Sequence, residues 1–183
     1  MRVIAICGPK RSGKDTIAKH ITEKYGYKHF KIAENLKSVC GLLFGFSHEQ
    51  MEDDSKDKVD PKYNISPRQA MQFVGTEMMQ YKIQELLPNV GRNFWINLLL
   101  QNTKNESHIV ISDMRFLHEY EALRRYDLFV IQVFKDLHIQ TLDNHSSEIE
   151  WSKIPANIKI HNNSSIENMY KLIDDALVKI NNS

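Results

Sequence analysis

The sequence has little cysteine, little net charge and no long hydrophobic run, and each of these shortages excludes a class of protein. Its two cysteines, Cys7 and Cys40, are too few for a disulfide framework or a four-ligand zinc site. Its 24 lysines and arginines almost balance its 23 aspartates and glutamates, and a net charge of +1 argues against a nucleic-acid-binding protein. Its longest apolar stretches, such as 128–134, are far shorter than the ~20 residues of a membrane-spanning helix.

What remains is ordinary globular composition. The 183 residues, of which 42% are hydrophobic, suit one domain of roughly 150 residues with room for a subdomain. A glycine-rich loop begins at residue 8 and leaves no space for a signal peptide before it. We therefore expect a soluble cytoplasmic domain that contacts neither nucleic acid nor membrane.

Short apolar runs alternate with helical patterns along the chain. The expected strands are 3–7, 28–32, 109–112, 128–134 and 157–161. The expected helices follow residue 14, cover 33–46, 94–102 and 117–125, and begin at Pro67 after an N-cap at Ser66 and at Ile166 after an N-cap at Ser165. Strands that alternate with helices predict a parallel α/β sheet. The polar segment 48–64 is expected to be a mobile surface loop.

The segment between the first strand and the first helix has the spacing of a phosphate-binding loop. Gly8, Gly13 and Lys14 follow the pattern G-x-x-x-x-G-K. The glycines let consecutive backbone N–H groups turn inward, the helix N-terminus adds positive charge, and Lys14 can neutralise outer phosphates. The candidate nucleotide-binding residues are Gly8, Lys10, Arg11, Ser12, Gly13, Lys14, Asp15 and Thr16.

The residue after Lys14 departs from the usual pattern. P-loop NTPases place a serine or threonine there as a magnesium ligand, but this chain has Asp15 followed by Thr16. Nucleotide kinases commonly end the loop in Gly-Lys-x-Thr and let water complete the magnesium shell. Asp15 is therefore only a weak candidate for a metal ligand, and the absence of an Asn-Lys-x-Asp sequence argues against a GTPase.

Several segments together resemble the deoxynucleoside monophosphate kinases of bacteriophages and large DNA viruses. The P-loop at 8–16 is similar to that of this family. Further matching segments are Ala33-x-x-Leu36-Lys37, Pro67-Arg68 to Gly75-Thr76, the Trp95 helix, Ser112-Asp113-x-Arg115, His145-x-Ser147-Glu148, and Ile160-x-Asn162 before Ser165. Animal phosphomevalonate kinases share a similar loop and an Asp-x-Arg element, and they are the nearest alternative.

The resemblance implies a fold and an activity. The implied fold is a P-loop kinase with three α/β/α layers, five parallel strands, an acceptor-binding insertion at 33–104 and a lid at 135–153. The implied reaction is transfer of the γ-phosphoryl group of ATP, with Mg²⁺, to a deoxynucleoside monophosphate. A phosphomevalonate kinase-like enzyme and a non-catalytic ATP-binding module are the alternatives, and the chain could be a monomer or a homodimer.

Such a reaction brings two polyanions together, so cations are the main candidate site residues. The candidate catalytic residues are Lys14, Arg11, Asp113 and Arg115. Asp113 could orient Mg²⁺ through water or hold Arg115 or Lys14, and the Arg115 guanidinium suits bidentate phosphate binding. Arg68 opens a helix, where a cation is unfavourable unless it has another purpose such as acceptor phosphate binding.

The candidate substrate-binding residues are Lys37, Arg68, Gln72, Trp95, Arg115, Ser147 and Glu148. Gln72 lies one helical turn from Arg68 and could read a base edge. Lys37 could instead be a solvated surface lysine, and Trp95 could be a core residue. Ser147 and Glu148 could contact phosphates from the lid or simply cap a short helix.

Overall fold

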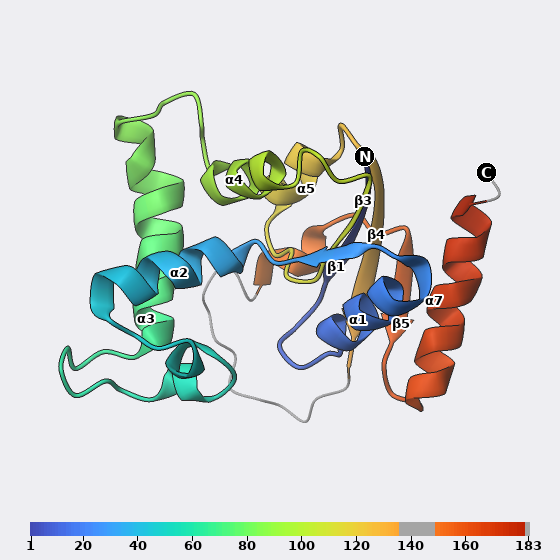
Figure 1. The fold of residues 1–183 in the computed structure, drawn as a ribbon, viewed down its shortest axis with the longest axis horizontal. Coiled ribbons are helices and arrows are strands. Elements are labelled where there is room, and N and C mark those ends of the chain that lie inside the picture. The colour runs from blue at the N-terminus through green and yellow to red at the C-terminus, as the bar shows by residue number, and fades with distance from the viewer. Residues whose placement is uncertain (136–148, 182–183) are drawn as a thin grey trace. The chain divides into compact units, whose positions relative to one another are not determined.

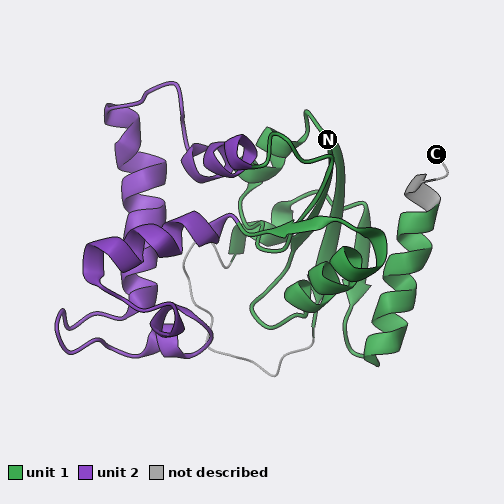
Figure 2. Ribbon diagram, in the orientation of Figure 1, with its two compact units in different colours: residues 1–31, 103–183 green, residues 32–102 purple. Residues whose placement is uncertain are grey.

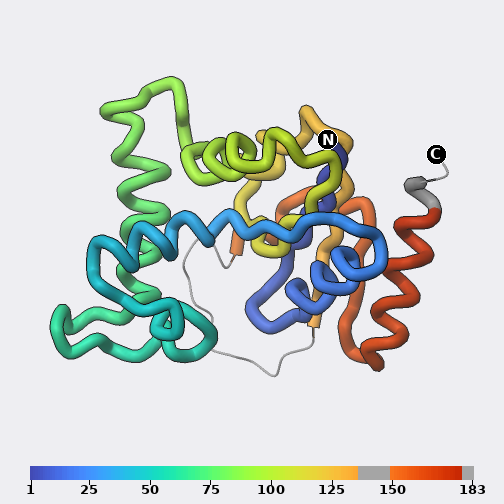
Figure 3. Tube along the Cα trace, in the orientation of Figure 1, coloured from blue at the N-terminus to red at the C-terminus, as the bar shows by residue number. Residues whose placement is uncertain are grey.

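The chain forms two compact units in the computed structural model, which describes residues 1–135 and 149–181. Unit 1 comprises residues 1–31 and 103–183, and unit 2 comprises residues 32–102 (Figure 2). The chain leaves unit 1 once, after Lys31, and re-enters it once, at Thr103 (Figure 3). Unit 2 is thus a single continuous segment of the chain, while the family resemblance implied an insertion at 33–104.

Five strands in the described part of unit 1 form one parallel sheet, in the order β2-β3-β1-β4-β5. The strands are β1 (Arg2–Cys7), β2 (Lys28–Phe30), β3 (His108–Ile111), β4 (Asp127–Phe134) and β5 (Ile158–His161). β1 lies at the centre, where Ile4 pairs with Val110 on one side and Phe129 on the other. The predicted five-stranded parallel sheet is confirmed, and all five expected strands are present.

Helices cover both faces of this sheet (Figure 1). α1 (Lys14–Tyr25) and α7 (Ile166–Asn181) share one face, because Ile17 and Ile173 pack in the same core cluster as Ile4 of β1. α5 (Leu117–Leu123) connects β3 to β4. This connection crosses the sheet in the direction opposite to that of the β1–β2 connection. Right-handed crossovers in opposite directions place their helices on opposite faces. The result is the predicted three-layer α/β/α arrangement.

Unit 2 is helical. Its elements are α2 (Ala33–Phe44), η1 (Glu49–Met51), η2 (Ser55–Asp57), α3 (Pro67–Gln72), η3 (Phe73–Tyr81), η4 (Lys82–Glu85) and α4 (Phe94–Asn102). Ser66 caps α3 as predicted: its hydroxyl accepts from the Gln69 N–H (3.2 Å), and the Gln69 side chain accepts from the Ser66 N–H (2.8 Å). This reciprocal capping box fixes where the helix with Arg68 and Gln72 begins.

The helix that starts at Pro67 changes from α-helical to π-helical geometry after Gln72, the last residue of α3. η3 is a π-helix of nine residues, although π-helical segments are usually single turns and are frequent at functional sites. Its centre packs tightly, because a Cβ at Gly75 would lie 2.6 Å from Leu36 Cδ2, and the Trp95 indole N–H donates to the Gly75 carbonyl (2.9 Å). Gly75 is therefore the point where α2, η3 and α4 meet.

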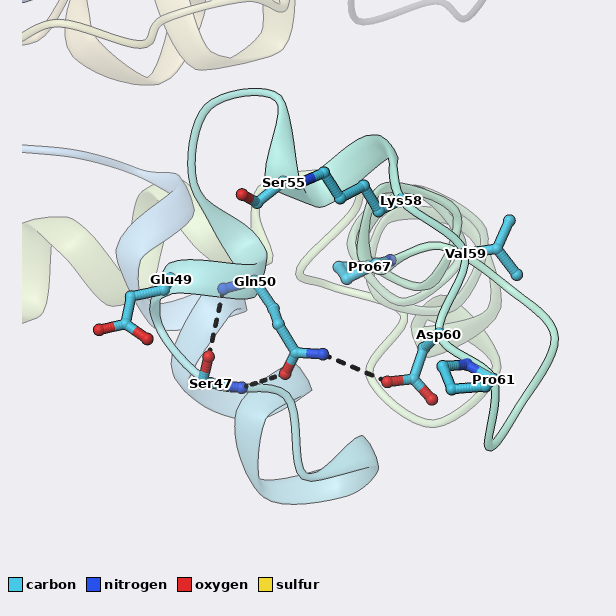
Figure 4. A pocket seen from close by; sticks show the side chains of 9 residues that line it. All are labelled: Ser47, Glu49, Gln50, Ser55, Lys58, Val59, Asp60, Pro61 and Pro67. Carbon is cyan, nitrogen blue, oxygen red and sulfur yellow. Dashed lines mark hydrogen bonds between the residues drawn. The ribbon is translucent and has the colours of Figure 1, made fainter.

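Residues 48–64, expected to form a mobile surface loop, make up together with Ser47 a segment, 47–64, that has structure of its own. It contains the short helices η1 and η2 and an antiparallel bridge between Asp60 and Ile65. Gln50 ties it together, since its side chain accepts from the Ser47 N–H (2.9 Å) and donates to Asp60 (3.2 Å) (Figure 4). These residues border a cavity of about 260 Å³ within unit 2.

The two cysteines are buried as free thiols. Burial raises the pKa of Cys7 to about 12 and that of Cys40 to about 11, so both stay protonated and unreactive at neutral pH. Among the described residues, no helix combines the length and apolar character that crossing a membrane requires.

Candidate active site

The P-loop of unit 1 has the backbone geometry that its glycines predict. Gly8 and Gly13 have φ angles of +150° and +99°, and Arg11 between them lies in the left-handed region at +62°. A Cβ at Gly8 would lie 2.3 Å from the Val133 carbonyl oxygen of the neighbouring strand, so only glycine fits there. Alternation of left- and right-handed residues is the geometry that turns successive N–H groups toward one anion.

Side chains hold this loop from within and from a neighbouring strand. The Lys14 ammonium donates to the Pro9 carbonyl (2.6 Å) across the loop. Asn162, which follows β5, donates through Nδ2 to the Ser12 carbonyl (2.9 Å). The same amide closes the space beside Gly13, since a Cβ there would lie 2.6 Å from Nδ2. Asn162 was part of the family resemblance, but the sequence alone gave it no role.

Several side chains of the loop itself can donate hydrogen bonds. Ser12 is fully buried, and its hydroxyl finds no hydrogen-bond partner among the described residues. Buried hydroxyls are almost always paired, so an isolated one beside a P-loop fits an anionic ligand. Lys10 is half-buried and Arg11 exposed, so the loop presents two further cations near its surface. The donor set matches a polyphosphate.

Asp15 takes part in a network at the carboxyl edge of the sheet. Its Oδ1 accepts from the Ser112 hydroxyl (2.6 Å) and its Oδ2 accepts from the Lys31 ammonium (3.0 Å). The Ser112 oxygen in turn lies 2.8 Å from His29 Nε2. The Asp15 side chain is 66% exposed; its partial desolvation alone would raise the pKa of Asp15, but the hydrogen bonds from Ser112 and Lys31 outweigh this and lower the pKa. Asp15 is therefore an ionised carboxylate with both oxygens engaged by protein donors.

The Asp-x-Arg element follows β3, the strand beside β1, so Asp113 and Arg115 lie at the same sheet edge as the P-loop. Both residues are half-buried. Glu119 organises the loop, because its Oε2 accepts from the backbone N–H groups of Arg115 (2.8 Å) and Phe116 (3.0 Å). Burial raises the pKa of Glu119 to about 7, although these two hydrogen bonds oppose the rise.

Sequence reasoning missed Glu119 as a site residue. Glu119 is the third residue of α5, and its side chain accepts from the backbone N–H of the N-cap residue Phe116, an apolar residue that does not show the usual serine, threonine or aspartate signal. A glutamate four residues after the Asp-x-Arg element was the only available sign.

The two candidate cations of unit 2 each bind a carboxylate of the segment 47–64. The Lys37 ammonium pairs with Glu52, and the lysine is only 9% exposed. The alternative of a solvated surface lysine is therefore wrong. The Arg68 guanidinium binds Asp57 with two nitrogens, Nε and Nη2, the second at 3.3 Å from Oδ2. Both cations are thus placed where an acidic group can bind them.

The remaining acceptor candidates have different surroundings. Trp95 is 5% exposed and its indole N–H is bonded within unit 2, so the structure favours the core role over base stacking. Gln72 is half-buried in the last turn of α3, one turn after Arg68. Ser147 and Glu148 lie outside the described residues.

Solved structures that resemble the chain show its fold class. Dephospho-CoA kinase from Campylobacter jejuni aligns with a TM-score of 0.52 and 14% identity, covering 98% of each chain. Shikimate kinase from Aquifex aeolicus aligns with a TM-score of 0.51 and 15% identity, covering 97% of this chain and 96% of that one. At these identities the likeness shows the fold alone, which is the P-loop kinase fold.

Sequence comparison narrows the class to a family. The family model for deoxynucleotide monophosphate kinase matches residues 2–64 and 42–173. A protein of Acanthamoeba polyphaga mimivirus, itself only provisionally assigned as a deoxynucleotide monophosphate kinase, is 29% identical over 185 residues, covering 94% of each chain. The chain belongs to the deoxynucleotide monophosphate kinase family, as the sequence resemblance predicted, and is a phosphotransferase.

Proposed function

We propose that this kinase transfers the γ-phosphoryl group of ATP to a deoxynucleoside monophosphate. An oxygen of the acceptor phosphate bonds to the γ-phosphorus, the bond from that phosphorus to the bridging oxygen breaks, and ADP and a deoxynucleoside diphosphate leave. The observation that carries the proposal is the P-loop, in which a buried hydroxyl, an ammonium and left-handed backbone at Arg11 and Gly13 lie at the start of α1.

The acceptor phosphate is already anionic near pH 7, so the reaction needs no general base to create the nucleophile. Its difficulty is electrostatic, because two polyanions must approach in line while charge moves onto the leaving oxygen. We assign Lys14 and Arg11 to the transferring and outer phosphates of ATP. Arg115, positioned through its own backbone by Glu119, is assigned to the phosphoryl group that passes between the two substrates.

The residues present also fit magnesium carried on the nucleotide. Across residues 1–135 and 149–181, no group of three or more histidine, cysteine, aspartate or glutamate side chains could hold a metal ion. Mg²⁺ usually keeps several waters and binds through substrate phosphates and one or two carboxylates, which agrees with that finding. We propose Asp113 as the carboxylate that orients the ion through water. When bound, the ion would neutralise phosphate charge.

For the acceptor we propose the α3 face that carries Arg68 and Gln72, together with Lys37. The Asp57 carboxylate that Arg68 binds has the same charge sign and the same two-oxygen geometry as a phosphate edge, which supports the assignment. Gln72, one turn further along, would then face the nucleoside. Ser147 and Glu148 stay proposed lid contacts.

A panel of acceptors tests the proposal. Purified protein is incubated with ATP, Mg²⁺ and each deoxynucleoside or ribonucleoside monophosphate in turn, with phosphomevalonate included, and ADP release is followed. We expect release with one or more deoxynucleoside monophosphates and its loss in Lys14→Met. Lys19→Met is the matched control, because Lys19 is an exposed lysine of the same helix. Release with phosphomevalonate alone favours the second kinase class, and ATP binding without transfer to any acceptor favours a non-catalytic module.

A further inference from the structure

The carboxylate that follows the P-loop lysine binds a second lysine. Asp15 comes directly after Lys14, and its Oδ2 accepts from the Lys31 ammonium at 3.0 Å. Lys31 follows β2 at the carboxyl edge of the sheet, the same edge from which the P-loop leaves β1 and the Asp-x-Arg loop leaves β3. Ligands of open α/β sheets bind at this edge. All of these residues belong to unit 1.

The hydrogen bonds that link Asp15 to Ser112 and Ser112 to His29 have a defined direction. A carboxylate only accepts, so the Ser112 hydroxyl uses its single proton on Asp15 Oδ1 (2.6 Å). The Ser112 oxygen must then accept from His29, whose Nε2 lies 2.8 Å away, and this fixes the Nε2–H tautomer. Burial and the nearby Lys31 lower the pKa of His29, which keeps the ring neutral at pH 7 and agrees with that tautomer. His29 and Ser112 thus hold the carboxylate in one orientation.

A carboxylate at this position needs an explanation. Coulomb repulsion between Asp15 and a bound polyphosphate would weaken nucleotide binding at the short distances of a P-loop. P-loop NTPases avoid the problem with a neutral hydroxyl, which binds magnesium. An ion pair with Lys31 removes the repulsion in another way. An ammonium has three donors, so one ammonium can contact both a carboxylate and a phosphate oxygen.

We propose that Lys31 is a phosphate-binding residue of the nucleotide site and that Asp15, Ser112 and His29 are its positioning residues. The inference rests on the proposed function, because it requires that the P-loop bind a nucleoside triphosphate. It accounts for the aspartate after Lys14: the position that recruits magnesium in NTPases recruits a lysine in this chain. Nucleotide affinity should therefore depend less on magnesium than it does in proteins with a serine or threonine at this position.

Titration calorimetry of ATP against the full chain, once with Mg²⁺ and once with EDTA, tests the inference without measuring catalysis. We expect Lys31→Met to weaken ATP binding about tenfold or more, as the loss of a charge-assisted hydrogen bond does, with the larger loss in EDTA. Lys31→Arg should restore most of the affinity. The matched control is Lys28→Met, because Lys28 begins the same strand, is exposed and pairs with Glu106 (2.8 Å).

A further variant separates the role of Asp15 from that of Lys31. Asp15→Asn keeps an acceptor for Ser112 but loses the ion pair, and it should give an intermediate loss of affinity. Unchanged ATP affinity in Lys31→Met, in a protein whose thermal unfolding matches that of Lys28→Met, overturns the inference. If the wild-type chain binds ATP but phosphorylates no monophosphate, the proposed function fails while the role of Lys31 is still decided by binding. If the wild-type chain binds no ATP, both fail.

Discussion

Arg68 binds Asp57 through two nitrogens and two oxygens, in the geometry that a guanidinium uses for a phosphate. The Arg68 side chain is 20% exposed and that of Asp57 is 43% exposed, so the pair is open to solvent on the carboxylate side. Lys37 and Glu52 repeat the arrangement in the same unit. An acceptor phosphate that binds the same two nitrogens of Arg68 must first displace this carboxylate.

This competition predicts opposite effects for the two partners. Arg68→Ala should raise the KM for the acceptor about tenfold or more, because a bidentate charge-assisted contact is lost. Asp57→Asn should lower the KM for the acceptor, since its neutral amide competes less with phosphate. Steady-state kinetics with ATP held saturating measures both, with Glu85→Gln as the control because Glu85 forms an exposed ion pair elsewhere in unit 2. A rise in KM for Asp57→Asn as large as that for Arg68→Ala would instead make Asp57 a residue that positions Arg68.

We expect substitution of Asn162 to weaken nucleotide binding while the protein keeps its fold. Asn162→Ala removes the donor to the Ser12 carbonyl and so loosens the loop from β5. We expect ATP affinity to fall about fivefold, which corresponds to about 1 kcal/mol for one hydrogen bond. Calorimetry measures the affinity, and the control is Lys159→Ala, because Lys159 is an exposed residue of β5, the strand that Asn162 follows. Equal affinity in both variants would show that the P-loop holds its shape without this amide.

The burial of Glu119 predicts that wild type and Glu119→Gln differ in stability by an amount that depends on pH. Burial raises its pKa from 4.5 to about 7, so the folded state disfavours the ionised form, and the wild-type protein loses stability as pH rises from about 4.5 to about 7. Glu119→Gln has no charge to bury and keeps a carbonyl acceptor for the two backbone N–H groups. Its stability relative to wild type should therefore increase across that interval and level off above it.

Urea unfolding of both proteins at several pH values measures this difference. Glu119→Ala serves as the comparison, because it leaves two buried N–H groups without their acceptor and should be destabilised by about 1–3 kcal/mol. A constant difference between Glu119→Gln and wild type over the whole interval would contradict the prediction.

Asp174 of α7 is bonded to residues of α1, and its surroundings predict the opposite dependence of stability on pH. Burial would raise its pKa, but hydrogen bonds from Lys24 (2.7 Å), Tyr25 (2.7 Å) and His20 (2.8 Å) outweigh burial and lower the pKa to about 2. A lowered carboxyl pKa stabilises the fold above the unfolded value near 3.8, and this stabilisation is lost as pH falls toward 2. Asp174→Asn should cost about 2 kcal/mol at pH 7 and almost nothing at pH 2.

Thermal or urea unfolding at pH 7, 4 and 2.5 measures the effect of Asp174→Asn. The control is Asp175→Asn, because Asp175 is an exposed neighbour on the same helix. If Asp174→Asn costs as much at the lowest pH as at pH 7, the contacts of Asp174 stabilise the protein through packing and not through charge.

Much of the fold was predictable because its signals are local. Buried β-branched runs such as that around Ile4 mark strands, and the Ser66–Pro67 start of α3 is fully encoded by an N-cap and a first-turn proline. The P-loop glycines also follow from sequence, since Gly8 and Gly13 have the φ angles that only glycine adopts easily.

Other features depend on contacts between distant residues, which no sequence pattern shows. Gly75 within the π-helix is packed against Leu36 of α2 and Trp95 of α4, which lie far from it in the sequence. The pairing of Asp15 with Lys31 and Ser112 joins three elements of the sheet edge. Lys37 was indistinguishable from a surface lysine until its carboxylate partner Glu52 was known.

The single entry and single exit of unit 2 have an evolutionary consequence. Because residues 32–102 interrupt the chain only between β2 and β3, mutations, insertions and deletions there leave the order of strands in the sheet unaltered. The sheet and the P-loop of unit 1 are thereby separated in sequence from such changes. Lineages could exchange or remodel this module to accept new metabolites while inheriting the same phosphate-transfer machinery intact.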